Sequence, residues 1–525
     1  MKKFIILSLL SLTGTCLLAQ PPKNLSLLGS LAYPGQSLSG VWHYNDTSGN
    51  EYALVGASDG ISIVDITNPA LPVELFQLPG VYSIWHEVKV QGDFAYAVSE
   101  GVDTNGTKNG MQIIDLRYLP DSAPHIFYKG DGLIANQLQT AHSITTAGHY
   151  VYVNGHNIFS MGRGVLILDI TDPLAPAYVG AITARYCHDS YVRGDTIYTS
   201  DISDGLFTIY DITDPALPVQ LATQQTPGFF NHNTWLSDDG LTIFTTDEHG
   251  NEPLGAYDIS DFSNITLIDT FFNGYFKANE VHNVRVLNDF LINPSYGSQL
   301  TIADAMRPAN IIEIANYTTG NGLCWDADPY TNSGNIIATD KNPGMLYIFA
   351  PDYIRACYLE GNITDSITGF PIANANVVIQ SISIADFSDL LGNYKTGYAD
   401  SGTYVVAYSK AGYDTKQLQV NLQHGILTIQ DVELVPAGTS IHSLEAHPIS
   451  IFPNPAVDFV IVQDNSTQIS SWELVDNQGR IVLQNSADFK TTERVKIDLS
   501  GISKGIYTIR IQRSEGTVIR QISRL

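Results

Sequence analysis

Short stretches in which apolar and polar residues alternate run along most of the chain, and one of them recurs. It reads ISIVDITNPALPV at 61–73, VLILDITDPLAPA at 165–177 and FTIYDITDPALPV at 207–219. Related versions lie at 111–125, 255–266, 300–311 and 346–351. Such alternation is typical of half-buried β-strands, and a repeat of about 40 to 55 residues has the size of a four-stranded propeller blade. The pattern predicts an all-β protein with seven repeats.

Each repeat predicts four strands, which we name a, b, c and d in chain order. Strands a and b precede the recurring phrase, as in HSITTAGHYVYVNG (142–155) and HDSYVRGDTIYTSD (188–201), and glycine-containing turns join them. The phrase itself is strand c, and a segment such as PAYVGAIT (176–183) is strand d. The Asp of the phrase meets a turn rich in Pro, Asn or Asp, so we expect it to bond backbone amides there.

The seventh repeat has strands a, b and c over 324–350 but no strand d after them. At the other end of the chain, NLSLLGSLAYPG (24–35) resembles a strand d that has no a, b or c before it. We therefore expect 24–35 to pair as the outermost strand beside 344–350, because this closes the ring and leaves no unpaired strand edge at the seam. The prediction is a seven-bladed β-propeller over residues 22–355.

Two smaller strand-rich modules follow the predicted propeller. Residues 358–435 contain short alternating strands with glycine turns, and residues 447–525 contain a second set that begins at ISIFPNPAVDFVIV. Residues 436–446 lie between them and predict a linker. The size and the strand spacing of each module predict a small β-sandwich domain.

The first twenty residues predict a secretory signal peptide. They carry two lysines, an apolar run from Phe4 to Leu12 and Ala19 before Gln20. After them no apolar run approaches the roughly 18 residues that a membrane helix needs, so we expect no transmembrane helix in the mature chain.

Charge and cysteine content exclude several classes of protein. The chain has 27 Lys and Arg against 53 Asp and Glu, a net charge of −26, so it offers no basic surface for nucleic acid. Three cysteines remain after the predicted signal peptide, at 187, 324 and 357, and such a sparse, odd set is no disulfide framework. No nucleophile elbow, P-loop or dinucleotide fingerprint is present in the sequence, so no catalytic residue is identified.

Three families resemble parts of this sequence. The repeats, with cores such as LILDITDP and SIVDITNP, resemble the LVIVD-repeat propellers of the choice-of-anchor B family over roughly 22–355. The opening GNITDSITGFPIANANVVI (361–379) is similar to a carboxypeptidase regulatory-like domain, although the segment after it diverges. FPNPAVDFVIV (452–462) and IDLSGISKGIYTIRI (497–511) resemble a type A C-terminal sorting domain of the type IX secretion system.

The resemblance to the sorting domain implies where the protein is exported, and none of the three resemblances implies a catalysed reaction. A protein of this kind crosses the inner membrane of a Gram-negative bacterium by its signal peptide, which is cleaved, and the outer membrane through the type IX secretion machinery. The sorting domain is then usually removed, and the protein is released or attached to surface lipopolysaccharide. The expected location is the outer-membrane surface or the extracellular medium.

The sharpest candidate site is formed by residues at the start of strand a. A histidine opens this strand in six repeats, beginning near His43 in the first, and a tryptophan opens it in the seventh. The candidate ligand-binding residues are His86, His142, His188, His232, His282 and Trp325. Strands a and b are antiparallel neighbours, so these side chains should share one face with the ends of strands b. These ends carry Glu100, His156, Asp201, Asp247 with Glu248, and Asp340.

Imidazole and carboxylate together suit zinc, copper or iron, so a divalent metal ion is the candidate cofactor. The candidate ligands are His188, His232, His282, Asp201 and Asp247. The competing interpretation is structural, because a histidine repeated once per blade can hold each blade in the same way. A third interpretation is contact with an organic ligand and no metal.

Two classes of function follow. The first is a secreted or cell-surface binding and scaffold protein whose propeller recognises a glycan, a peptide or another envelope protein. The second is a metal-dependent hydrolase or lyase that uses the histidine and aspartate cluster at the channel mouth. The missing catalytic motifs favour the first class.

Overall fold

The computed structural model describes residues 22–272, 280–297, 299–320, 322–382, 384–437, 449–464, 469–485, 493–513 and 516–525. The predicted signal peptide (1–20) and most of the predicted linker (436–446) lie outside these residues. Within them the chain forms β-strands and three short 3-10 turns, η1 (Gly132–Ile134), η2 (Phe159–Met161) and η3 (Ile202–Asp204), and no α-helix. The prediction of an all-β protein is confirmed.

The first part of the chain folds into four-stranded antiparallel sheets, each built mostly from consecutive strands a to d. The first three are β2 (Leu38–Asn45), β3 (Glu51–Ala57), β4 (Gly60–Asp65) and β5 (Val73–Pro79); β6 (His86–Gln91), β7 (Phe94–Ser99), β8 (Met111–Asp115) and β9 (His125–Tyr128); and β10 (Ser143–Ala147), β11 (Tyr150–Asn154), β12 (Val165–Asp169) and β13 (Ala177–Ile182).

Three more sheets follow the same order. They are β14 (Asp189–Arg193), β15 (Thr196–Asp201), β16 (Leu206–Asp211) and β17 (Val219–Gln225); β18 (Asn231–Leu236), β19 (Thr242–Asp247), β20 (Leu254–Asp258) and β21 (Thr266–Phe271); and β22 (Arg285–Leu287), β23 (Phe290–Ser295), β24 (Gln299–Asp304) and β25 (Ile312–Thr318). Neighbouring sheets contact each other through strands a and, in places, strands b, as β6 does with β10 and β23 with β26 (Cys324–Asp328).

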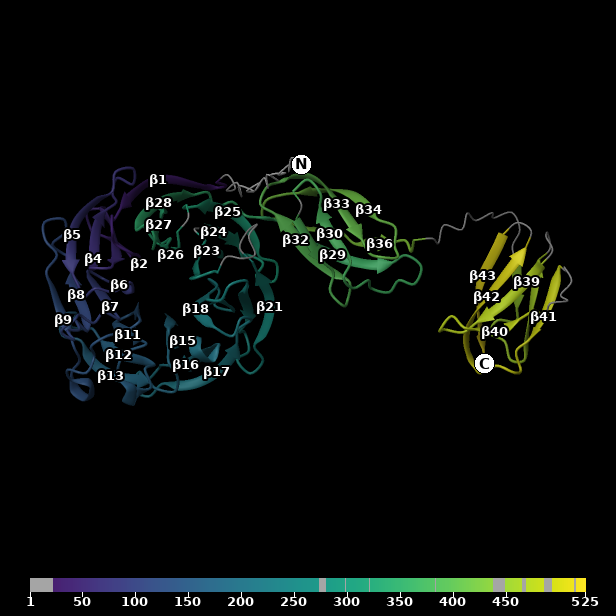
Figure 1. Cartoon of the computed structure of the whole chain (residues 1–525), viewed down its shortest axis with the longest axis horizontal. Coiled ribbons are helices and arrows are strands. Elements are labelled where there is room, and N and C mark those ends of the chain that lie inside the picture. The colour runs from purple at the N-terminus through teal and green to yellow at the C-terminus, as the bar shows by residue number, and fades with distance from the viewer. Residues whose placement is uncertain are drawn as a thin grey trace, which may run out of the picture. The chain divides into compact units, whose positions relative to one another are not determined.

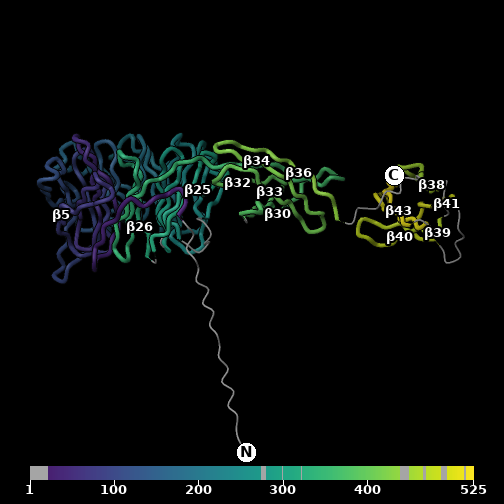
Figure 2. The backbone as a smooth tube through the Cα atoms, turned by 90° about the horizontal axis from the view of Figure 1, so that it is seen from above, coloured from purple at the N-terminus to yellow at the C-terminus, as the bar shows by residue number. Residues whose placement is uncertain are grey.

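A seventh four-stranded sheet joins the two ends of this region. It consists of β26 (Cys324–Asp328), β27 (Ile336–Asp340), β28 (Met345–Pro351) and β1 (Leu25–Ala32). β1 pairs antiparallel with β28, for example Ser26 with Ala350 and Leu31 with Leu346. The expected pairing of 24–35 beside 344–350 is therefore confirmed. β26 also contacts β2, so the last of these sheets lies beside the first. Figure 1 shows the sheets arranged in a ring, and Figure 2 shows them from a direction turned by 90°.

The repeated phrase explains both the core and the turns of these sheets. Its apolar residues lie between neighbouring sheets; for example, Ile63 of the first sheet shares a core with Val88 and Ala97 of the second. Its Asp accepts a hydrogen bond from the backbone N–H two residues later, at 2.7 Å for Asp169 and Thr171. The same bond is 2.8 Å for Asp211, so these carboxylates hold turns as expected.

The next module contains two sheets. One consists of β32 (Asn393–Tyr398), β29 (Cys357–Asp365), β35 (Leu427–Ile429) and β36 (Val432–Leu434), and the other of β31 (Ile384–Phe387), β30 (Asn376–Ile379), β33 (Gly402–Ser409) and β34 (Lys416–Leu422). Contacts between Cα atoms divide the chain into two compact units, and this module falls with the ring in the first unit, 1–410 and 415–434.

The second compact unit comprises 411–414 and 435–525. Its sheets are β37 (Ile449–Phe452), β38 (Phe459–Asp464) and β41 (Arg494–Asp498), and β40 (Ile481–Gln484), β39 (Ile469–Val475), β42 (Gly505–Arg513) and β43 (Gly516–Arg524). Val460 and Val462 of one sheet share a hydrophobic core with Leu474 and Ile509 of the other. Across the described residues, no helix is both long enough and apolar enough to cross a membrane.

Candidate functional site

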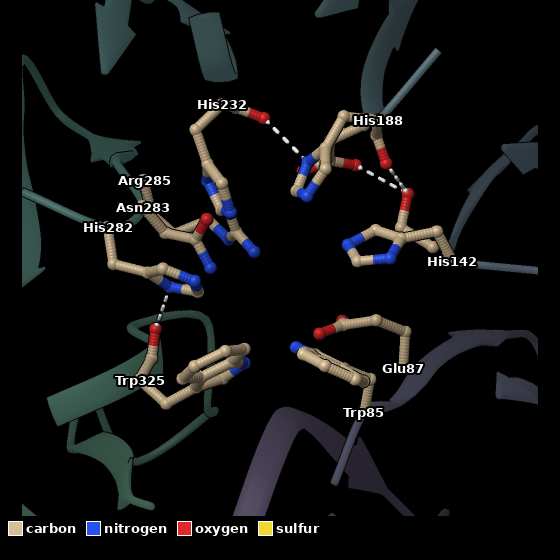
Figure 3. A pocket seen from close by; sticks show the side chains of 11 residues that line it. Trp85, Glu87, His142, His188, His232, His282, Asn283, Arg285 and Trp325 are labelled. Carbon is tan, nitrogen blue, oxygen red and sulfur yellow. Dashed lines mark hydrogen bonds between the residues drawn. The ribbon is translucent and has the colours of Figure 1, made fainter. Parts of the chain in front are cut away.

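A pocket lies at the centre of the ring, where the starts of strands a from six sheets converge (Figure 3). The residues that line it share this position or stand a few residues away from it. They are Trp85, Glu87, His142, Ser143, His188, Asp189, His232, His282, Asn283, Arg285 and Trp325. We call this site the histidine pocket.

Five aromatic rings follow one another around the wall of the histidine pocket. The ring centroids are 4.0 Å apart for His142 and His188, 4.2 Å for His188 and His232, and 4.2 Å for His232 and His282. His282 and Trp325 continue the series at 4.2 Å, and every pair is tilted by between 44° and 50°. Since each ring comes from the next sheet, the regular spacing follows from the repeat itself.

Backbone carbonyls fix the orientation of two of these imidazoles. Nδ1 of His188 donates to the carbonyl oxygen of His232 at 3.1 Å, and Nδ1 of His282 donates to that of Trp325 at 2.5 Å. A neutral imidazole has one N–H, so Nε2 of each ring keeps its lone pair. Burial lowers the pKa of His188 and His282 well below the usual value, which keeps both rings neutral.

Glu248, one residue beyond the end of β19, brings a carboxylate to these imidazoles. Its Oε2 lies 3.7 Å from Nε2 of His232, and its Oε1 lies 3.9 Å from Nε2 of His282. The hydroxyl of Tyr296 donates to Oε1 at 2.6 Å. His188, His232 and Glu248 each offer one ligand atom, and these three atoms lie within 4.8 Å of one another.

The remaining candidate carboxylates have other partners. Asp201 accepts from the Thr208 hydroxyl at 2.5 Å, and burial raises its pKa to about 6. Asp247 accepts from the Thr226 hydroxyl at 2.5 Å and from the backbone N–H of Phe230 at 2.8 Å. Neither aspartate belongs to the group that contains Glu248.

The last two acidic candidates, Asp340 and Glu100, form hydrogen bonds with nearby residues. Asp340 accepts from the Thr319 hydroxyl at 2.7 Å and from the backbone N–H of Leu323 at 2.7 Å. Glu100 lies 3.1 Å from Nδ1 of His142, and this hydrogen bond lowers the pKa of Glu100. Of the carboxylates expected on this face, Glu100 and Glu248 thus lie against pocket histidines.

Two histidines lie elsewhere than the repeat suggests. His86 is buried, but the preceding Trp85 lines the pocket in its place, and burial lowers the pKa of His86 to about 4. His43 was expected near the start of strand a, but it lies near the end of β2. The reason is that β2 starts at Leu38, and the hydroxyl of Ser39 accepts the backbone N–H of His86 at 2.8 Å near the pocket end.

Charged groups lie in the pocket and beside it. Arg285 is fully buried, and its Nη2 donates to Asp326 at 3.0 Å. Burial raises the pKa of Glu87 to about 7. Nζ of Lys341 lies 3.5 Å from the ring centroid of Trp325 and 5.0 Å from that of Trp85, and burial lowers its pKa to about 8. Spacing in the sequence did not indicate Lys341.

The loops at this end of the ring carry exposed aromatic side chains. Tyr82 is 65% exposed, Phe159 79% and Phe229 61%. Tyr82 and Phe229 lie on loops that lead into strands a, and Phe159 lies on a loop between strands b and c. The guanidinium of Arg163 lies between two aromatic side chains, 5.3 Å from the ring of Phe159 and 5.0 Å from the ring of Tyr186.

Comparison with known families assigns three segments. Residues 450–523 match a secretion system C-terminal sorting domain, residues 359–443 a CarboxypepD_reg-like domain and residues 47–78 an LVIVD repeat. The sorting domain implies export by the type IX secretion system to the cell surface or the extracellular space, and the LVIVD repeat implies a β-propeller surface protein. A search of curated proteins found no match.

Solved structures resemble the chain only distantly. The β-propeller domain of Cps50 (Swd1) from Myceliophteria thermophila is 11% identical, with a TM-score of 0.45, and the match covers 63% of this chain and 100% of that one. A protein from Lactobacillus plantarum is 14% identical, with a TM-score of 0.46, over 61% and 92% of the two chains. Likeness at this level says nothing about a ligand.

Proposed function

We propose that the chain is a seven-bladed β-propeller protein of the choice-of-anchor B type that binds carbohydrate outside the cell through the histidine pocket and its aromatic rim. Its role is binding rather than catalysis. After export, the sorting domain is removed and the protein is released or attached to surface lipopolysaccharide.

The proposed domains keep the boundaries expected from the sequence. They are a cleaved signal peptide (1–20), the propeller (22–355), a carboxypeptidase regulatory-like β-sandwich (358–435), a linker (436–446) and a sorting β-sandwich (447–525). The seven four-stranded sheets and the paired sheets of the two smaller modules support this division, as do the family matches at 47–78, 359–443 and 450–523.

The observation that carries the binding role is the gathering of rings and polar atoms at one end of the ring of sheets. Six sheets direct side chains into the histidine pocket, and Tyr82, Phe159 and Phe229 are exposed on loops at that end. Flat aromatic faces pack against the C–H surface of a sugar, while imidazole, indole and carboxylate groups exchange hydrogen bonds with hydroxyls. The net charge of −26 favours a neutral or cationic saccharide over an anionic one.

The test is titration of the purified full-length protein with neutral oligosaccharides. The probes are hexasaccharides of β-1,4-glucose, α-1,4-glucose, β-1,4-xylose and β-1,4-mannose, followed by calorimetry and by tryptophan fluorescence. We expect at least one probe to bind, and the Phe159→Ala, Tyr82→Ala double variant to weaken binding about tenfold or more.

Leu217→Ala is the matched control, because Leu217 is 71% exposed on a c–d turn at the opposite end of the ring. This variant should bind like the wild type. Two results contradict the proposal: none of the four hexasaccharides binds, or the rim variant binds as tightly as the control.

A further inference from the structure

We propose that His188, His232 and Glu248 bind a divalent late transition-metal ion such as Zn²⁺, with His282 as a fourth donor. The site lies inside the histidine pocket of the proposed function, but it does not require that the pocket bind carbohydrate. The two proposals therefore fail separately.

The donor atoms are close to the separation that a metal requires. Donor atoms around a tetrahedral zinc ion lie about 3.3 to 3.5 Å apart when each is about 2.0 to 2.1 Å from the metal. Oε2 of Glu248 is already 3.7 Å from Nε2 of His232, and Oε1 is 3.9 Å from Nε2 of His282. With the donor atoms of His188, His232 and Glu248 within 4.8 Å of one another, small side-chain rotations bring the set together.

Groups behind three of the four donors, His188, His282 and Glu248, hold them as metal ligands are usually held. A metal-binding imidazole normally donates its other N–H to a carbonyl or carboxylate, which orients the ring. His188 and His282 do this through Nδ1, to the carbonyl oxygens of His232 and Trp325. The Tyr296 hydroxyl holds the carboxylate of Glu248 at 2.6 Å in the same way.

A buried polar atom at the site supports a ligand independently of this spacing. His282 is 2% exposed, and within the part of the chain that the structure describes its Nε2 has no hydrogen-bond partner. Its ring points into the histidine pocket beside His232 in Figure 3. A buried lone pair without a partner costs free energy, and a metal ion that binds it removes this cost.

The donor chemistry selects the class of ion. Imidazole nitrogens with one carboxylate suit Zn²⁺, Cu²⁺, Ni²⁺ and Co²⁺, whereas Ca²⁺ and Mg²⁺ require a shell of oxygen atoms. Glu248 explains why the site is proposed once although histidines recur in neighbouring sheets. Its carboxylate lies against Nε2 of His232 and of His282, and within the described part of the chain it forms one group with His188 and His232.

The experiment uses the purified full-length protein after chelator treatment and dialysis. Zn²⁺ is titrated by calorimetry, and Co²⁺ by the visible d–d bands that a tetrahedral site makes intense. We expect one ion per chain with an affinity in the micromolar range or tighter, and excess Mg²⁺ should not compete. His232→Ala should abolish the Co²⁺ bands.

Two further variants keep the test independent of folding. Tyr296→Phe retains the ring and removes the hydroxyl that positions Glu248, so it should weaken Zn²⁺ binding about 10- to 100-fold with an unchanged circular dichroism spectrum. His149→Ala is the matched control, because His149 is exposed in the turn between β10 and β11, at the other end of the ring. It removes one imidazole and should bind Zn²⁺ like the wild type.

Several results overturn the metal site. They are the lack of saturable Zn²⁺ binding in the micromolar range, equal binding by His232→Ala and His149→Ala, or unchanged affinity in Tyr296→Phe. Zn²⁺ binding without binding of any hexasaccharide supports the metal site and contradicts the proposed function. Oligosaccharide binding by a protein that takes up no Zn²⁺ does the reverse.

Discussion

The two ends of the central strands a use histidine in opposite ways. In the histidine pocket, His188 and His282 are held through Nδ1 by backbone carbonyls, and Nε2 of each remains for a ligand. At the other end, Nδ1 of His43 lies 2.7 Å from the buried carboxylate of Asp328, and the backbone N–H of His43 donates to the same oxygen at 2.7 Å. One repeat thus places imidazoles with a free Nε2 at the start of strand a and an internal pairing with a carboxylate a few residues later.

Aromatic rings also differ between the two ends. At the far end, Tyr191 and Trp235 are 4.3 Å apart, and Trp235 stacks with Tyr330 at 6.2 Å. Cations reach these rings from inside, with Lys89 4.5 Å from the ring of Trp42 and the guanidinium of Arg285 4.8 Å from that of Trp235. Because these side chains contact one another, we expect the far end to contribute stability, whereas we propose that the histidine pocket contributes binding.

The largest expected effect is on stability at the far end. Asp328→Asn removes the charge that pairs with His43 and leaves an amide among N–H donors, so we expect the free energy of unfolding to fall by about 3 kcal/mol. The measurement is urea unfolding followed by tryptophan fluorescence, which reports mainly on the ring because four of the five tryptophans lie there. A loss below about 1 kcal/mol, the range of a surface pair, contradicts the assignment.

A second, smaller effect should distinguish the ends by pH. Although burial opposes it, Asp328 raises the pKa of His43 above 6.5. The pairing therefore stabilises the fold fully below about pH 6.5 and is lost as the pH rises through the raised pKa, while the lowered pKa of Asp328 keeps that carboxylate charged down to below pH 3.8. Burial lowers the pKa of His282, so the fold loses stability as the pH falls below 6.5.

The two histidine variants should thus change stability in opposite directions with pH. His43→Ala should cost most between about pH 4 and 6.5 and less above that range. His282→Gln should gain on the wild type as the pH falls below 6.5, by up to about 1.4 kcal/mol for each pH unit until the lowered pKa of His282 is reached. Denaturant midpoints of the wild type and of both variants, measured from pH 4.5 to 8.5, test these expectations. If the midpoints of the two variants change with pH in the same direction relative to the wild type, the prediction is wrong.

Much of the fold could be predicted from the sequence, because the information is repeated. Alternation identified the strands, the recurring phrase identified the sheets, and the missing last strand indicated the pairing of β1 with β28. The starts of strands a converge because six of the seven sheets place nearly the same repeat position at the pocket. For that reason four of the five candidate histidines, with Trp325, line one pocket.

The sequence could not show which of two neighbouring side chains reaches the histidine pocket, because this depends on single-residue shifts at strand ends. Successive residues of a strand face opposite ways, so a local irregularity decides which of two neighbours points to the axis. The pairing of β18 with β19 shifts between Asn231 and Asn233, and Glu248 rather than Asp247 reaches the imidazoles. A turn precedes β6, and in it the Ser83 hydroxyl accepts a hydrogen bond from the Trp85 N–H at 3.1 Å. After this turn Trp85, rather than the expected His86, lines the pocket.

The smallest expected effect on stability comes from the same chemical change at the histidine pocket. Glu248→Gln replaces a carboxylate by an amide, as Asp328→Asn does, but the Glu248 side chain is 24% exposed and its imidazole contacts are 3.7 and 3.9 Å long. We expect the free energy of unfolding to change by less than about 1 kcal/mol, because a partly solvated pair contributes little. If both ends serve stability, Glu248→Gln should instead cost as much as Asp328→Asn. A fold left intact by Glu248→Gln, together with lost Zn²⁺ uptake, means that this carboxylate is kept for a ligand and not for the fold.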